Sequence, residues 1–201
     1  MNYYISDTHF GHENIIVHDA KNGGRTFKNI KEHDDLIIHN WNNVINPSDN
    51  VYILGDFSWL NGEETKKLIE KLNGTKFLIK GNHDYWVKNG ECKRLFQGIY
   101  DYKEINDNGK RLILSHYPIL FYNGQHRGTI HLYGHVHNSR EYEIYENTCK
   151  NIAETTDIPC NTYNVGCMID YMDYTPRTVD ELIRENINRI NIDNTEDKVL
   201  E

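Results

Sequence analysis

Histidine and aspartate residues stand in short patterns that suit the binding of metal ions. The chain has 11 histidines among 201 residues, more than a domain without a metal has an obvious use for. Two patterns place potential ligands at alternate positions, Asp7-Thr8-His9 and His135-Val136-His137. Because alternate side chains of an extended segment lie on the same side, each pair can hold one ion.

Further potential ligands follow other short apolar runs. Gly55-Asp56 and Ser115-His116 each come directly after such a run, and Gly81-Asn82-His83-Asp84 begins one residue after another. Carboxylate, amide and imidazole ligands without thiolate favour borderline or hard divalent ions such as Mn, Fe or Zn. The same set disfavours Cu(I) and iron–sulfur clusters.

The apolar runs are the predicted strands that position these residues. They are the runs 3–5, 51–54, 77–79, 112–114 and 130–133. Two predicted helices separate the first three of these runs. One covers about residues 29–44, and the other extends from a predicted N-cap at Asn61 to Gly74. This alternation indicates an α/β fold with a parallel sheet, which binds ligands at the carboxyl ends of its strands. We therefore expect these side chains at one rim: Asp7, His9, Asp56, Asn82, His83, His116, His135 and His137.

The second half of the chain has weaker signals. Within residues 139–163, polar and apolar residues alternate from Glu141 to Tyr145, which is typical of an exposed strand or hairpin arm, and surface loop is expected after it. Thr178-Val179-Asp180-Glu181 predicts a capping box that opens a helix through about Ile190. We expect one domain over residues 1–190 and a polar, frayed tail over 191–201.

Composition limits the classes of function. Thirty acidic residues against 22 basic ones leave a net charge of −8, so the chain lacks the positive charge of a protein that coats long nucleic acid. No apolar run is long enough for a signal peptide or a membrane span, which predicts a cytoplasmic protein without a membrane partner. The four cysteines form no C-x-x-C pair and are expected to be free thiols. The oligomeric state stays open.

Taken in order, the motifs resemble those of the calcineurin-like metallophosphoesterase superfamily. The series is Asp7-x-His9, Gly55-Asp56, Gly81-Asn82-His83-Asp84, His116 and Gly134-His135-x-His137. Finer features resemble its small, single-domain bacterial and phage members: residues 7–12, Asn40-Trp41-Asn42, His116-Tyr117-Pro118 and Asn164-Val165-Gly166. The resemblance runs from residue 1 to about 185. It implies a four-layer α/β/β/α sandwich that holds two metal ions.

The resemblance also implies which residues hold each ion. The first set is Asp7, His9, Asp56 and His137, and the second is Asp56, Asn82, His116 and His135. Asp56 would bridge the two ions, which stand roughly 3.5 to 4 Å apart in such centres. The implied metal is Mn, with Fe, Zn or Ni as alternatives.

Other residues are expected to act beside the metals. His83 is not a ligand in the family pattern and would stand over the scissile phosphate, stabilising charge or protonating the leaving oxygen. Asp84 would orient the His83 ring, with capping of the following turn as the alternative. Candidate substrate contacts are His12, Arg25, His126 and Arg127, and a plain loop role is the alternative for each. His12 could also brace a metal ligand. Surface or core packing is expected for His18, His33 and His39, and a position in the core or behind the ligands is expected for His131.

The implied activity is hydrolysis of a phosphoester through attack by a metal-bridging hydroxide. Without an accessory domain or basic run, a small soluble phosphodiester, such as a nucleotide-derived one, is preferred as substrate, and phosphatase activity on monoesters stays open. A nuclease acting on DNA or RNA ends shares these motifs but normally brings a capping domain or cationic groove. A catalytically weak binding scaffold is the alternative of a different class. Both the full ligand set and His83 argue against it.

Overall fold

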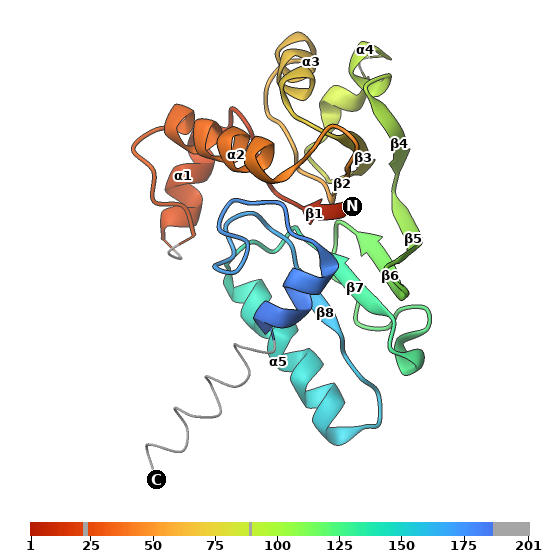
Figure 1. Cartoon of the computed structure of the whole chain (residues 1–201). Coiled ribbons are helices and arrows are strands. Elements are labelled where there is room, and N and C mark those ends of the chain that lie inside the picture. Colours follow the sequence, from red (N-terminus) through yellow and green to blue (C-terminus); the bar gives the residue numbers. More distant parts are fainter. Residues whose placement is uncertain (22–23, 89, 187–201) are drawn as a thin grey trace.

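Two four-stranded sheets organise the chain in the computed structural model, which describes residues 1–21, 24–88 and 90–186 (Figure 1). The first sheet contains, in this order and all parallel, β1 (Asn2–Ile5), β2 (Asn50–Ile53), β3 (Thr75–Ile79) and β4 (Phe96–Tyr100). The second contains β5 (Tyr102–Asp107), β6 (Lys110–Ser115), β7 (Ile130–Tyr133) and β8 (Thr162–Asn164), with β5 antiparallel to β6 and the other pairs parallel. The predicted α/β class is confirmed, and the four-layer sandwich stays a prediction.

Helices connect these strands and cover the sheets. They are α1 (Glu13–Ala20), α2 (Ile30–Val44), α3 (Gly62–Lys71), α4 (Gly90–Lys93) and α5 (Arg140–Thr155), with short 3-10 turns η1 (Tyr85–Lys88) and η2 (Gln125–Arg127). In Figure 1, α2, α3 and α4 accompany the first sheet and α5 accompanies the second. Asn29 and Asn61 cap α2 and α3, each accepting a hydrogen bond from a backbone N–H three residues on, so both predicted helices are confirmed.

The two sheets share one hydrophobic core. Ile5, Ile53 and Leu78 of the first sheet belong to the same buried cluster as Leu114 and Leu132 of the second. Complete burial of an aliphatic side chain of this size contributes about 1.5–3 kcal/mol. The ends of both sheets are therefore fixed relative to one another, which is what a site assembled from both sheets requires.

Residues 140–155 form helix α5, so the expectation of an exposed strand followed by loop is wrong. Ser139 caps the helix, and Tyr142, Tyr145 and Cys149 are buried along one face at helical spacing. The Tyr145 hydroxyl donates to the carbonyl oxygen of Ile119 at 2.9 Å, outside the helix. The alternation that suggested a strand spans only five residues, which is too few to distinguish the period of a strand from that of a helix. Packing against the second sheet decides in favour of the helix.

The end of the described chain follows the predicted capping box. The backbone N–H of Thr178 donates to the Glu181 carboxylate at 2.8 Å, and that of Glu181 donates to the Thr178 hydroxyl at 3.3 Å. Residues 179–186 are helical, and both the predicted helix end at Ile190 and the tail 191–201 lie outside the described residues. All four cysteines are free, as predicted. In the described part of the chain, no helix is long and apolar enough to cross a membrane.

Candidate metal centre

Two groups of potential metal ligands lie beyond the carboxyl ends of the strands. The first group is Asp7, His9 and His137, and the second group is Asp56, His116 and His135. Within each group, one ligand atom from each residue lies within 4.8 Å of the others. These residues follow β1, β2, β6 and β7, so strand ends from both sheets meet at one place.

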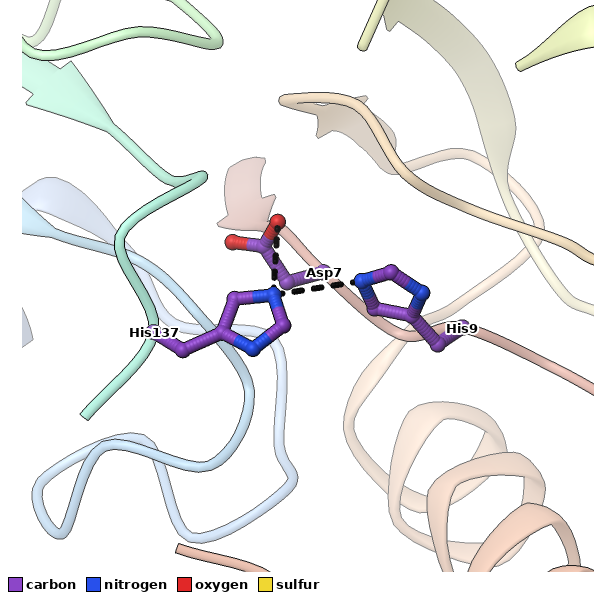
Figure 2. A group of neighbouring side chains, drawn as sticks. All are labelled: Asp7, His9 and His137. Carbon is purple, nitrogen blue, oxygen red and sulfur yellow. Dashed lines mark hydrogen bonds and ion pairs between the residues drawn. The ribbon is translucent and has the colours of Figure 1, made fainter. Parts of the chain in front are cut away.

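The first group converges on a single point (Figure 2). The Nε2 atoms of His9 and His137 are 3.2 Å apart, and His137 Nε2 lies 3.6 Å from Asp7 Oδ1. Two imidazole nitrogens and a carboxylate oxygen that face one another in a largely buried space suit a shared divalent cation. The donor set therefore fits the metal that the sequence implied.

Asp56 joins the two groups. Its Oδ2 atom lies 3.8 Å from His9 Nε2 in the first group and 3.5 Å from His116 Nε2 in the second. Its other oxygen accepts the backbone N–H of His83 at 2.8 Å. Asn82 Oδ1 lies 3.0 Å from His116 Nε2, which brings the amide to the second group. All seven ligands implied by the sequence resemblance thus meet at this centre.

The backbone at most of these ligands is left-handed. The positive φ angles are 54° at Asp7, 46° at His9, 50° at Asp56, 72° at His135 and 47° at His137. This conformation costs a residue other than glycine about 1–2 kcal/mol, and such strain persists at functional sites, where the surrounding structure holds it. The Asp-x-His and His-x-His pairs therefore direct their side chains to the centre from strained turns, a correction to the extended segments inferred from spacing.

Two glycines allow the loops to approach the ligands closely. A Cβ atom on Gly134 would lie 2.4 Å from Asp7 Oδ2, and one on Gly81 would lie 2.2 Å from Asp56 Oδ1. With no side chain at Gly134, the backbone N–H of His135 donates to the Asp7 carboxylate at 3.0 Å. This contact explains why glycine precedes the ligand in the motifs that identified the site.

Two histidines are held with their Nε2 atoms toward the centre. His137 Nδ1 donates to Asp19 Oδ1 at 3.0 Å, and His116 Nδ1 donates to the carbonyl oxygen of Leu54 at 2.8 Å. Because Nδ1 carries the proton in both, Nε2 keeps the lone pair that a metal needs. In the metal-free protein, burial lowers the pKa of each ring, but hydrogen bonds and charges from Asp56, Asp7 and Asp19 outweigh it and raise both pKa values to about 9.

His83 lies beside the centre in an aromatic setting. Its ring centroid is 4.2 Å from that of Trp59 and 6.1 Å from that of His9. Trp59 also stacks on His12 at 3.8 Å with the ring planes 4° apart, and it is 42 % exposed. Burial lowers the pKa of His12 to about 4. Trp59 follows Asp56 by three positions and was not identified from the sequence.

Asp84 has a different setting from the one expected. Its carboxylate accepts backbone N–H groups from Asp56 at 3.0 Å, Phe57 at 2.9 Å and Gly81 at 2.8 Å, and the indole N–H of Trp86 at 3.1 Å. Asp84 thus ties the loop after β2 to the loop after β3. Among the described residues, no hydrogen bond joins its carboxylate to the His83 ring, and none comes from a backbone N–H of the following turn, so neither expected role is observed.

Three of the four candidate substrate contacts, Arg25, His126 and Arg127, are not placed to meet a substrate at the centre. Arg25 is completely buried and bonded to Asp19, so it is not free to meet a substrate. His126 and Arg127 are exposed in η2, which precedes β7, whereas the ligands follow β7. At about 3.3 Å per residue, the length of β7 separates them from the centre by roughly 13 Å. Only His12 of these candidates lies at the centre, with its Nδ1 3.4 Å from His9 Nδ1.

A cavity opens beside the first group. Its volume is about 280 Å³, and its lining residues are Asp19, His135, Val136, His137, Ser139 and Glu141. His135 and His137, the potential ligands that follow β7, both line this cavity. Of the histidines expected to be packing residues, His33 and His131 are completely buried, whereas His18 and His39 are exposed at the surface.

Comparisons with known proteins identify relatives that are similar in length to this chain. No protein-family profile matches it. The uncharacterized protein MJ1445 of Methanocaldococcus jannaschii is 36 % identical over 159 residues, which cover 78 % of this chain and 81 % of that protein. The chain belongs to the MJ1445 family. The solved structure of the protein of unknown function AQ665 from Aquifex aeolicus is 31 % identical and overlays with a TM-score of 0.66, covering 94 % of this chain and 98 % of the other.

The likeness to the AQ665 structure therefore extends over nearly the whole fold described above. The phosphoesterase Yfce from E. coli is 17 % identical, with a TM-score of 0.29 over 67 % of this chain and 69 % of its own. That likeness is too distant to support a conclusion about activity.

Proposed function

We propose that this protein hydrolyses phosphoesters with the help of two divalent metal ions. The observation that carries the proposal is the position of Asp56 Oδ2, within 3.8 Å of His9 Nε2 in one ligand group and 3.5 Å of His116 Nε2 in the other. A carboxylate shared by two ligand groups is what a two-metal hydrolase needs. The order of the motifs along the chain, which resembles the calcineurin-like superfamily, supports the same activity.

The ligand chemistry favours Mn, with Fe, Zn or Ni as alternatives. The two groups offer carboxylate and imidazole, with the Asn82 amide beside them, and contain no thiolate. Ions held there would polarise a phosphate ester and activate water for attack. The chain's own contribution is to hold the ligands in place through the left-handed turns and the hydrogen bonds to His116 and His137.

His83 is the proposed proton donor. Its backbone N–H donates to Asp56, so the residue is anchored to the shared carboxylate without giving a ligand atom in this assignment. Its ring is partly exposed and stands beside Trp59, on the side of the centre where His9 lies. A proton delivered from this ring to the departing ester oxygen would assist cleavage.

The preferred substrate is a small phosphodiester, for which a nucleotide-derived ester is one candidate. The net charge of −8 disfavours long nucleic acid, so a nuclease acting on ends is the second choice. A binding scaffold is the third, and the two complete ligand groups beside His83 argue against it.

A panel of esters with defined metals tests the proposal. Chelated protein would receive Mn, Ni, Zn or Mg and then p-nitrophenyl phosphate, bis-p-nitrophenyl phosphate or a 5′-labelled oligonucleotide. We expect Mn to restore hydrolysis, with the diester preferred. Release of nucleotides at a higher rate than diester cleavage would favour the nuclease, and metal binding without hydrolysis of any ester would favour the scaffold.

A further inference from the structure

Arg25 lies behind the first ligand group, and the proposed reaction gives it no role. Its side chain is 0 % exposed, which is rare for arginine and requires partners for its donors. We propose that Arg25 is a positioning residue that holds all three members of the first group, Asp7, His9 and His137, at once. This inference rests on the proposed metal centre and adds a residue that controls one of its two sites.

The first arm of the guanidinium leads to His137. Arg25 Nε donates to Asp19 Oδ2 at 2.7 Å, and the other oxygen of Asp19 accepts the Nδ1 proton of His137 at 3.0 Å. A carboxylate behind a metal-binding histidine fixes the tautomer and the ring orientation. Arg25 in turn fixes that carboxylate and balances its buried charge.

The second arm leads to Asp7. Arg25 Nη2 donates to the carbonyl oxygen of Asp7 at 2.5 Å, and the Cys167 thiol donates to the same oxygen at 3.3 Å. Asp7 has a φ of 54°, so its backbone needs outside support to keep the strained turn. The contact therefore stabilises the direction in which the Asp7 carboxylate leaves the chain.

The third arm reaches the loop of His9 through two residues. Arg25 Nη1 lies 2.7 Å from His33 Nε2. Since a guanidinium only donates, His33 Nε2 must accept, and its Nδ1 proton goes to Asp34 Oδ1 at 2.8 Å. The other oxygen of Asp34 accepts the backbone N–H of Gly11 at 2.9 Å, two residues after His9.

The second ligand group is supported in another way. His116 Nδ1 donates to the main-chain oxygen of Leu54, and Asp84 holds the backbone N–H of Asp56. Neither contact involves Arg25. Loss of the guanidinium should therefore loosen one ion and leave the other. Lysine cannot replace it, because a single ammonium cannot span three acceptors in a planar fork.

Arg25→Lys tests this inference, with Arg111→Lys as the matched control. Arg111 on β6 forms an ion pair with Glu104 on β5, away from the centre. Equilibrium dialysis against Mn would measure both dissociation constants of each metal-free, folded protein. We expect two ions per chain in wild type and control, and in Arg25→Lys a loss of about 10- to 100-fold in affinity for one ion only.

A second substitution identifies the weakened site. In the Arg25→Lys background, His135→Ala should remove the remaining tight ion, whereas His137→Ala should change little. Equal weakening of both ions, or no change in either, would overturn the inference, since a general loss of packing does not select one site. If Arg25→Lys fails to fold by circular dichroism, Asp19→Asn takes its place and should weaken the same ion. Wild-type protein that binds no Mn would overturn the proposed function, whereas wild type with two ions and an unaltered Arg25→Lys would overturn this inference alone.

Discussion

The two ligand groups differ in what holds them. The first group depends on side chains from the segment between β1 and α2, where Asp19 supports His137 through a buried ion pair with Arg25. The second group depends on main-chain contacts at the ends of the sheets, as in the bond from His116 to Leu54. A centre that looks symmetrical in its ligands is therefore asymmetric in its support, so the two ions should respond differently to substitution.

Removing the shared carboxylate should have the largest effect, because it acts on both groups. Asp56→Asn keeps the shape but loses the charge between the two sets of histidines. Support residues behind a ligand typically contribute 10- to 100-fold in affinity, and we expect the loss here to exceed about 100-fold for both ions. Metal analysis after dialysis and turnover of a diester would measure it. Asp107→Asn, a carboxylate bonded to Tyr4 on β1, is the control and should keep both ions.

His83→Asn separates chemistry from metal binding. We expect both ions to stay bound while turnover falls on the order of 10²-fold to 10⁴-fold, because a proton donor is lost. An ester with a poor alkoxide leaving group should suffer more than an aryl ester, whose phenolate leaves without a proton. Loss of metal together with activity would instead make His83 a ligand. Unchanged rates on every ester would withdraw its catalytic role.

Asp84→Ala examines the support of the second group. The substitution leaves four donors without their acceptor, three from the backbone and one from Trp86, and all but the N–H of Gly81 are buried. We expect the free energy of unfolding to fall by about 3 kcal/mol or more. Urea denaturation of the metal-free protein would measure the change, with Asp180→Ala, an exposed carboxylate near Lys110, as the control. A difference below about 1 kcal/mol, the usual net worth of one hydrogen bond, would show that Asp84 is not structural.

The stability of the metal-free protein should depend on pH through His116 and His137. Their pKa values are raised to about 9 in the folded protein, against 6.5 as the ordinary value. The folded state therefore binds more protons than the unfolded state between these values, and its stability falls as pH rises from 6.5 to 9. Melting temperatures in EDTA should decrease over this range. With Mn bound the decrease should disappear, since the metal takes the place of the protons. A melting temperature in EDTA that does not change between pH 6.5 and 9 would contradict the raised pKa values of His116 and His137.

The smallest effect is expected at η2. His126→Ala and Arg127→Ala alter exposed residues at the amino-terminal end of β7, roughly 13 Å from the ligands by strand length. Turnover and metal content should stay within about twofold of wild type, because neither residue reaches the centre. A large rise in KM for either variant would restore the substrate contact that the sequence had suggested.

The ligands could be predicted from the sequence, but their support could not. Asp7 and Asp56 follow neighbouring parallel strands of the first sheet, whose ends meet at one edge whatever the loops do, and His116 likewise follows an apolar strand, β6 of the second sheet. Asp19 meets His137 across 118 positions of sequence, in a segment without a strong periodic pattern. Contacts of this kind arise only when the whole fold has formed, so no local signal identified Asp19 or assigned Arg25 correctly.

The sequence also failed to predict three strands and one helix, because the local patterns of these segments are weak or ambiguous. Strands β4, β5 and β8 are short or mixed in polarity, so their sequences carry a weak alternating pattern. Helix α5 begins with residues whose pattern fits either period. The left-handed turns at the ligands were hidden as well, because spacing along the chain does not report backbone angles.

The central claim is that two ions share Asp56, and electron paramagnetic resonance of the Mn-loaded protein tests it most directly. Titration of metal-free protein should reach two Mn per chain, and the spectrum should show a pair coupled through the shared carboxylate. In Asp56→Asn that coupling should disappear. A ceiling of one Mn per chain, or two Mn ions without coupling in the wild-type protein, would contradict the account.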